Sequence, residues 1–324
     1  MAVYTTFSLT DADRLALAHD LGHARRIHPV SAGTVNTNHL LETDTETVFV
    51  RIYEHQDAEG VAYEWALLDH LKAAGLAVPH RIAGPEPFEV TVSGKATAVF
   101  AVVGGVELCQ ARVTPVHTRA VGAFLGKAHV ACRSFGLRRE SRFGIERIRG
   151  QLGWARDAAE RCDRRDLDEP ITRLEQTAQA LVREEPRGVP SGVIHGDLFR
   201  DNVRFEDDSI VSVLDWESAS DGPLAYDLAV AVLAWCFGDE MEWELAQALL
   251  SGYMEQRTLP VSERLSLHAF FRRACVRFAT TRIADIELRP AIGERKVKDY
   301  RRFLARLEAI EAETAEGLCA RLGI

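Results

Sequence analysis

Hydrophobic and polar positions in the first hundred residues follow two different periods. Residues 10–21 and 61–74 carry apolar side chains at helical spacing, and Gly75 stands where a helix C-cap belongs. Residues 39–53 and 89–103 instead alternate around short polar or glycine-containing turns. The pattern therefore predicts two helices and two β-hairpins in this part of the chain.

After Gly104-Gly105 the pattern becomes mainly helical. One β-rich island interrupts it, where two runs of strand-forming residues at 203–205 and 210–214 flank a polar turn. We therefore expect an α+β fold with two lobes, a β-rich lobe at 1–104 and a mainly helical lobe at 105–324. The helices expected in the second lobe cover residues 114–134, 167–185, 224–237, 240–256, 260–286 and 294–319.

Composition and charge narrow the class of protein. The 324 residues are 47% hydrophobic and 27% charged, with 39 Lys and Arg against 48 Asp and Glu, a net charge of −9. This charge disfavours a general nucleic-acid or anionic-membrane surface. The six cysteines are scattered without a CxxC pair, which indicates reduced thiols and no zinc site. Because no signal peptide or membrane-length apolar run is visible, we expect a cytoplasmic protein. We further expect a monomer or a homodimer.

The candidate chemistry lies around the β-rich island. His195 and Asp197 precede the first strand, Asn202 comes five residues after Asp197, and Asp215 ends the second strand. Phosphoryl transfer from a nucleotide needs a carboxylate for the acceptor hydroxyl and oxygen ligands for the metal. These residues have that spacing, and an oxygen-only ligand set suits Mg²⁺. The alternative is a polar turn whose side chains only satisfy backbone groups.

The β-rich lobe offers a place for the nucleotide. Residues 31–39, which include Gly33 and Asn36, form a small-residue loop where kinases cover the phosphates. Arg51 lies on the next strand and Glu64 on the following helix, so the two could pair and direct a cation at the phosphates. Taken alone, the loop is ordinary and the two charges are ordinary surface residues. A P-loop-like stretch at 122–128 is one residue short and lacks the Ser or Thr.

The motif from His195 to Asn202, with Asp215, resembles the Brenner-type motif of the aminoglycoside phosphotransferase and choline kinase superfamily. Within it, the chain most resembles the bacterial homoserine kinases. The stretches that carry this resemblance are MAVYT at 1–5, VNTN at 35–38, LFRDNV at 198–203, AYDLAV at 225–230, AWCF at 234–237, ACVRF at 274–278 and TR at 281–282.

The resemblance implies a protein-kinase-like fold and an ATP- and Mg²⁺-dependent kinase that phosphorylates L-homoserine in threonine biosynthesis. It implies that Asp197 is the catalytic base, that Asn202 and Asp215 bind Mg²⁺, and that Arg51 contacts phosphate while paired with Glu64. It also places adenine against the 100–104 segment, with Val102 and Val103. Arg51 departs from the family, because many kinases have lysine there.

A homoserine acceptor would carry an ammonium and a carboxylate, and each needs a partner. Glu217, an acid that homoserine kinases usually lack at this place, and Asp221 could bind the ammonium; Asp227 is expected to brace a loop. Arg277 or Arg282 could bind the carboxylate, unless they form a solvated helix face. The alternatives are an aminoglycoside or macrolide phosphotransferase, a choline- or ethanolamine-type kinase, and a nucleotide-binding pseudokinase.

Overall fold

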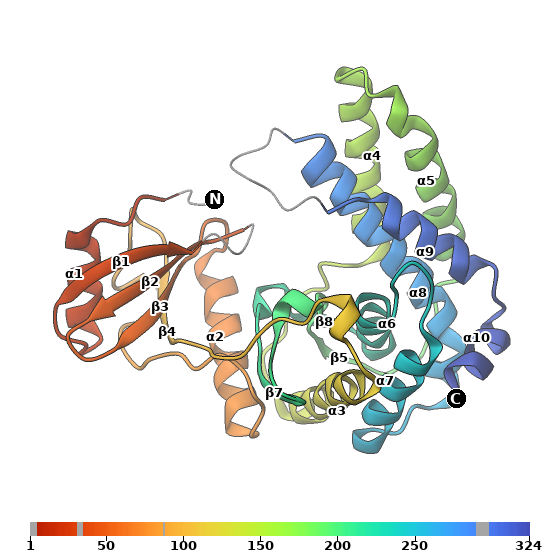
Figure 1. Ribbon diagram of the computed structural model, residues 1–324. Coiled ribbons are helices and arrows are strands. Elements are labelled where there is room, and N and C mark those ends of the chain that lie inside the picture. Colours follow the sequence, from red (N-terminus) through yellow and green to blue (C-terminus); the bar gives the residue numbers. More distant parts are fainter. Residues whose placement is uncertain (1–4, 31–34, 87, 290–297) are drawn as a thin grey trace. The chain divides into compact units, whose positions relative to one another are not determined.

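Two units make up the chain in the computed structural model, which describes residues 5–30, 35–86, 88–289 and 298–324 (Figure 1). The first unit contains the described residues up to Gly105 together with Val211–Glu217. The second contains Val106–Ile210 and the described chain from Ser218 onward. Asp215 therefore belongs to the first unit, whereas Asp197 and Asn202 belong to the second.

The first unit is built on a four-stranded antiparallel sheet with the strand order β1-β2-β3-β4. The predicted hairpin at 39–53 and the predicted helices at 10–21 and 61–74 are confirmed, with ends shifted by a few residues. The elements are α1 (Leu9–Ala18), β1 (Ala24–Val30), β2 (Thr37–Thr43), β3 (Thr47–Ile52), α2 (Ala58–Ala73) and β4 (Thr97–Ala101).

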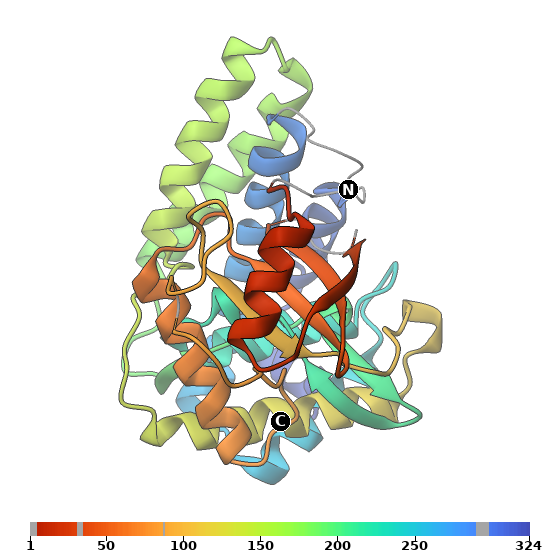
Figure 2. The ribbon, with the colours of Figure 1, turned by 90° about the vertical axis from the view of Figure 1, so that its left-hand side faces the viewer.

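The two faces of this sheet have different partners. Val48, Val50 and Ile52 of β3 are fully buried in one apolar cluster with Leu15 of α1, which lies against the sheet in Figures 1 and 2. Successive side chains of a strand point to opposite faces. Arg51 therefore lies on the other face, where α2 provides its partner.

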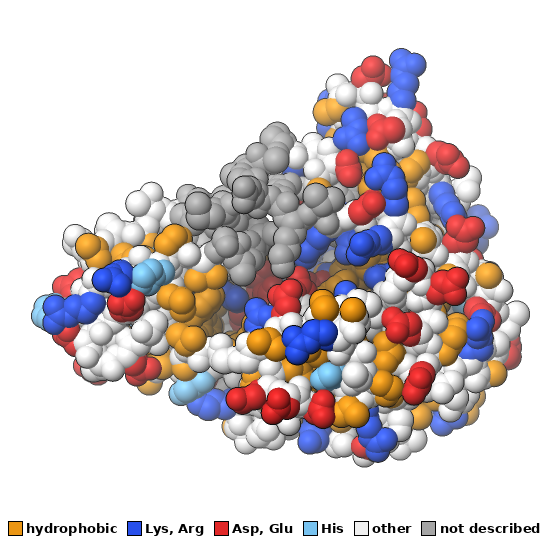
Figure 3. Space-filling model, viewed as in Figure 1, with side chains coloured by type: hydrophobic (Ala, Val, Ile, Leu, Met, Phe, Trp, Pro, Cys, Tyr) orange, Lys and Arg blue, Asp and Glu red, His pale blue; other side chains and the backbone are white. Residues whose placement is uncertain are grey.

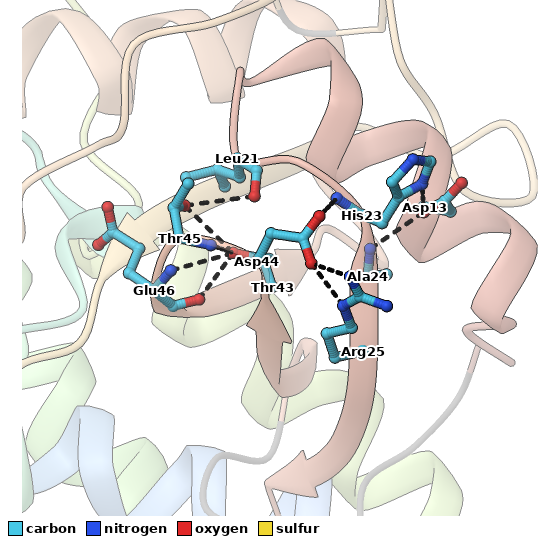
Figure 4. Close-up of polar contacts among 9 residues, drawn as sticks. All are labelled: Asp13, Leu21, His23, Ala24, Arg25, Thr43, Asp44, Thr45 and Glu46. Atoms are coloured by element: carbon cyan, nitrogen blue, oxygen red, sulfur yellow. Dashed lines mark hydrogen bonds and ion pairs between the residues drawn. The ribbon is translucent and has the colours of Figure 1, made fainter.

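Polar contacts join the α1–β1 turn to the β2–β3 turn (Figure 4). The Asp44 carboxylate accepts hydrogen bonds from the His23 backbone N–H at 2.8 Å and from the Arg25 guanidinium. Asp13 accepts from the Ala24 backbone N–H and the His23 imidazole, each at 3.0 Å. The backbone donors hold the pKa of both carboxyls below its usual value. These contacts fix the end of the sheet at which the α1–β1 and β2–β3 turns meet.

The second unit is mainly helical, as predicted, and contains the short antiparallel pair β5–β8 and the β6–β7 hairpin, whose second strand continues into the first unit. Helix α6 is buried along its whole length, as expected for a helix apolar on all sides. The elements are α3 (Pro115–Ala131), α4 (Ile145–Arg161), α5 (Asp168–Arg183), β5 (Ser191–Ile194), β6 (Val203–Glu206), β7 (Ser209–Val213), β8 (Ser220–Pro223), α6 (Leu224–Trp235), α7 (Trp243–Gln256), α8 (Val261–Arg282), α9 (Arg301–Glu311) and α10 (Ala315–Leu322).

Several expected elements differ from the structure. The second hairpin is wrong before its turn, because residues 89–92 contribute only the isolated bridge Val92↔Lys95, while β4 pairs with β3. Helix α8 ends at Arg282 and continues as the π-helical turn Ile283–Glu287. The last predicted helix, 294–319, begins outside the described residues, and its described part contains two helices, because Thr314 caps a new one by accepting from the Gly317 N–H. Strands β1, β5 and β8 and helix α4 were not predicted.

Helices α3 and α7 pack closely through glycine. A Cβ atom placed on Gly122 would collide with the Leu249 carbonyl of α7, and one on Gly252 would collide with the Arg119 carbonyl of α3. The backbones of α3 and α7 can therefore approach this closely only because Gly122 and Gly252 have no side chain. The P-loop-like stretch at 122–128 lies inside α3, and its glycines serve this packing.

Gly122→Ala should lower the free energy of unfolding by about 1–3 kcal/mol, because the added methyl must push two helix backbones apart. Gly150→Ala in α4 is the matched control. Its Cβ would meet open space, so the better helix propensity of alanine should raise stability by about 0.5–1 kcal/mol. Urea unfolding of both variants measures the two changes, and equal changes in the same direction would contradict the packing argument.

Charged side chains of both signs are interspersed on the face of the helical unit shown in Figure 3. Their mixture agrees with the similar numbers of acidic and basic residues in the chain. Among the described helices, none is both long and apolar enough to cross a membrane.

Candidate active site

The loop after β5 carries His195, Gly196 and Asp197, and Asp227 of α6 holds its backbone in place. The carboxylate of Asp227 accepts hydrogen bonds from the backbone N–H of His195 at 2.7 Å and of Gly196 at 2.8 Å. This is the loop-bracing role expected for Asp227, which is fully buried. Burial raises the pKa of its carboxyl, but His129 and the backbone donors outweigh burial and hold the pKa below its usual value. A buried anion thus fixes the loop backbone.

Gly196 permits the turn of this loop. Its φ is +75°, in the left-handed region that favours glycine, and a Cβ there would collide with the Phe143 ring. The backbone N–H of Asp197 then donates to the His195 Nδ1 at 3.2 Å. The turn at Gly196 and the hydrogen bond to His195 together fix the backbone conformation at Asp197.

Arg277 and Asn202 flank Asp197 in the second unit. The Arg277 guanidinium lies 3.6 Å from the Asp197 Oδ1 and donates to the Gly196 carbonyl. Its central carbon is 3.6 Å from the centre of the Phe143 ring and 4.2 Å from that of Phe278, so both rings hold it in place. The Asn202 amide donates to the Asp197 carbonyl at 2.8 Å, which leaves its oxygen Oδ1 as a possible ligand.

Arg51 is the centre of the charged group in the first unit. Its guanidinium lies 3.3 Å from the Glu64 Oε1 of α2 and 3.9 Å from the Asp215 Oδ1. The Glu64 side chain is 1% exposed and that of Asp215 is 36% exposed. Burial lowers the pKa of Arg51, but the neighbouring carboxylates, Glu64 first, raise it above its usual value. Arg51 is therefore a fixed cation between two carboxylates.

Hydrogen bonds hold the Asp215 segment in the first unit. The backbone N–H of Val213 donates to the Ala77 carbonyl at 2.8 Å. The buried Glu217 accepts from the amide of Asn36 and, at 3.5 Å, from that of Gln56. Between these contacts Asp215 has a φ of +64°, a conformation that aspartate and asparagine adopt more readily than most residues.

The Asn36 amide also uses its oxygen, which accepts from the Glu54 N–H at 3.2 Å. Both ends of the Asn36 side-chain amide therefore make hydrogen bonds to other residues of the first unit, and its predicted contact with the nucleotide stays a prediction. Val102 follows β4 with 49% of its surface exposed, and Val103 beside it is half-buried. Gly33, the remaining residue expected to bind the nucleotide, lies outside the described residues.

The residues expected to bind the acceptor fall in different surroundings. Glu217 belongs to the first unit with Asn36, and Asp221 to the second. Asp221 accepts from the Arg139 backbone N–H at 2.9 Å and from Arg138 at 3.0 Å, which ties down the loop before α4. Arg282 is half-buried at the end of α8 and donates to the Asp299 carbonyl at 2.8 Å.

Comparison with known proteins assigns the chain to a protein family. Residues 26–261 match the family described as "Phosphotransferase enzyme family". The chain belongs to this family. A homoserine kinase from Parvibaculum lavamentivorans is 30% identical over 313 residues, with 95% of each chain covered. A homoserine kinase from Phenylobacterium zucineum is 34% identical over 319 residues, covering 94% of this chain and 95% of that one.

Solved structures agree on the fold of this phosphotransferase. The amicoumacin kinase hAmiN, in complex with AMP-PNP, Ca²⁺ and Ami, superposes with a TM-score of 0.69, 15% identity and 93% coverage of both chains. The predicted α+β, protein-kinase-like fold is confirmed. So is the predicted enzyme class: the protein is a kinase, a phosphotransferase with a hydroxyl acceptor.

Some residues of the site were not found from the sequence. Gln56, which also donates to the Glu64 Oε2 at 3.2 Å, has no motif around it. Phe143 lies 134 positions before Arg277, so their stacking has no local signal. His129, whose Nε2 is 3.1 Å from the Asp227 Oδ2, could have been suspected as a lone histidine on an apolar helix face.

Proposed function

We propose that this phosphotransferase transfers the γ-phosphoryl group of ATP, with Mg²⁺, to the side-chain hydroxyl of L-homoserine. The product would be O-phospho-L-homoserine, an intermediate of threonine biosynthesis. The observation that carries the transfer is the Asp227-anchored loop, which fixes Asp197 between Arg277 and Asn202. The choice of acceptor is supported by the homoserine kinases that match nearly the whole chain.

In the proposed reaction, Asp197 orients the acceptor hydroxyl and takes its proton. The hydroxyl oxygen forms a bond to the γ-phosphorus, the bond from that phosphorus to the β,γ-bridging oxygen breaks, and ADP leaves. Arg277, 3.6 Å from the carboxylate, keeps Asp197 in place before the transfer. Arg51, held by Glu64, would contact the nucleotide phosphates, where a guanidinium can bind in a bidentate manner.

Asn202 of the second unit and Asp215 of the first each have the side-chain chemistry of a Mg²⁺ ligand. Each can offer an oxygen, the donor that Mg²⁺ prefers, and the Asn202 amide is oriented by its bond to the Asp197 carbonyl. Three carboxylates, Glu64, Asp215 and Glu217, act on the single charge of Arg51, so the first-unit group is anionic. Bound Mg²⁺ would neutralise phosphate charge as it develops during transfer. The AMP-PNP and Ca²⁺ in the amicoumacin kinase complex support a nucleotide and a divalent cation here.

A coupled assay of ADP release tests the proposed function. The panel is L-homoserine, L-serine, L-threonine, choline, ethanolamine, kanamycin and erythromycin, each with ATP and Mg²⁺. Turnover with L-homoserine at a kcat/KM far above the others is expected, and phosphorus NMR of the product identifies the phosphate ester. Turnover confined to an antibiotic or amino alcohol would show that L-homoserine is not the acceptor, while the proposed phosphoryl transfer from ATP would stand. Nucleotide binding without any turnover would favour a pseudokinase.

Asp215→Asn should lower the affinity for ATP in the presence of Mg²⁺ by about tenfold, the value of one charge-assisted contact. Asparagine is the suitable replacement because it tolerates the positive φ at this position, whereas alanine would add strain. Calorimetric titration with ATP, with and without Mg²⁺, measures the effect.

Asp208→Asn is the matched control, an exposed acid in the β6–β7 turn that pairs with His117 at 3.3 Å. It should leave the Mg²⁺ dependence intact. An unchanged Mg²⁺ dependence in Asp215→Asn would remove Asp215 from the metal site.

A further inference from the structure

Three phenylalanines form a platform beside the catalytic loop. Phe199 of the loop lies 4.8 Å from Phe278 of α8, and Phe278 lies 5.0 Å from Phe303 of α9, between ring centres. Two guanidiniums of α8 rest on these rings: Arg277 at 4.2 Å from the Phe278 centre and Arg282 at 4.4 Å from that of Phe303. The platform therefore holds two cations of one helix next to the segment that carries Asp197.

The two arginines are not equivalent. The Arg277 side chain is 8% exposed and is enclosed by Phe143 and Phe278. It donates to the Gly196 carbonyl and pairs with the Asp197 carboxylate. Arg282 is half-buried, and within the described part of the chain its nitrogen Nη1 donates a hydrogen bond to the Asp299 carbonyl. A backbone carbonyl orients a guanidinium without neutralising it. The Asp299 contact thus orders the Arg282 side chain without pairing its charge.

The surroundings of Arg282 are rich in positive charge. Burial first, and then the charge of Arg302, lower its pKa to about 10, and Arg306 is affected in the same way with Arg282, Arg200 and Arg302 as neighbours. The carboxylates that act on Arg282 are Asp197, Asp299 and Asp201, of which Asp197 already faces Arg277 and Asp201 lies 3.7 Å from Lys298. An added anion would therefore be stabilised here, and an added cation disfavoured.

We propose that Arg282 binds the α-carboxylate of an amino-acid acceptor, and that this arginine-rich place selects amino acids over amino alcohols and polycationic antibiotics. This inference rests on the proposed function and specifies one contact of its acceptor. Arg282 would receive the carboxylate, whereas Arg277 is a positioning residue that holds the catalytic loop.

A comparison of two acceptors isolates the contact. 3-Amino-1-propanol is L-homoserine without its carboxylate, and both present the same primary hydroxyl and ammonium. For Arg282→Gln, kcat/KM with L-homoserine should fall about 10- to 100-fold, mainly through KM, as expected when a charge-assisted hydrogen bond is lost. The value with 3-amino-1-propanol should change by less than about threefold. Arg282→Lys, which keeps the charge but loses the planar fork, should lie between Arg282→Gln and the unaltered enzyme.

The control variant is Arg301→Gln at the start of α9, an exposed arginine 3.4 Å from Asp299, the residue that also contacts Arg282. It should leave the ratio of the two kcat/KM values unchanged. An equal fall for both acceptors in Arg282→Gln would overturn the inference and make Arg282 structural, with the proposed function intact. Equal use of both acceptors by the unaltered enzyme would overturn it in the same way. Absence of turnover with L-homoserine would overturn the proposed function and the inference together.

Discussion

Asp197→Asn should lower kcat by about 10²–10⁴, with little change in the affinity for ATP. Asparagine has nearly the same shape and can still accept a hydrogen bond, but it cannot take the proton of the acceptor hydroxyl. General-base catalysis contributes an effect of this size. The loop itself should stay in place, because its anchors are backbone groups of His195 and Gly196 on Asp227. Single-turnover measurements with saturating ATP separate this chemical step from binding.

Asp201→Asn is the control for that experiment. Asp201 lies four residues further along the same loop and pairs with Lys298 at 3.7 Å near the surface. Its kcat should stay within about threefold of the original value, because surface ion pairs contribute little. If Asp197→Asn turned over as fast as this control, Asp197 would not be the base.

Asp227→Ala should lower the free energy of unfolding by about 3–5 kcal/mol, the effect of breaking a buried charged pair. The substitution leaves the backbone N–H groups of His195 and Gly196 and the imidazole of His129 without their common acceptor. All three lie in the interior, where water cannot replace it. Urea unfolding measures the loss. Asp239→Ala, at an exposed position just after α6, should change stability by less than about 0.5 kcal/mol.

The pH dependence of stability gives a second measurement on Asp227. Its folded-state pKa lies below its usual value of 3.8, so its stabilisation is complete above about pH 4 and is lost as the pH falls through the lower, folded-state pKa. The unaltered protein should therefore lose more stability on acidification than Asp227→Ala does. Parallel acid curves for the two proteins would show that the Asp227 carboxylate does not contribute in this way.

The sequence was most informative where local pattern decides the structure. The strand-forming runs at 203–205 and 210–214 predict β6 and β7. The spacing of Asp197 and Asn202 predicts a loop, which the structure ties together through the Asn202 amide. Helix α4 was missed although Ile145, Ile148 and Leu152 follow a helical period, since its many arginines conceal the apolar stripe.

Tertiary contacts account for most of the remaining differences. Arg277 could have been part of a solvated helix face, and only the folded chain brings Phe143 against it. The prediction that Asp221 binds the acceptor remains a prediction. The structure adds that the pairing of β5 with β8 sets Asp221 opposite Val193 and that the loop at Arg138 and Arg139 contacts its carboxylate. Such partners are far away in sequence, so neither period nor spacing reveals them.

The path of the chain through its two units limits how this protein can be divided. The first unit is not one continuous segment, because it takes in Val211–Glu217 after the chain has passed through Val106–Ile210. A fragment ending at Gly105 would lack Val213, which bonds to Ala77, and Glu217, which bonds to Asn36. It would also leave Arg51 without Asp215. The unit is therefore a poor candidate for excision or for recombination as a module, and changes in its specificity are more easily made by substitution within the intact chain.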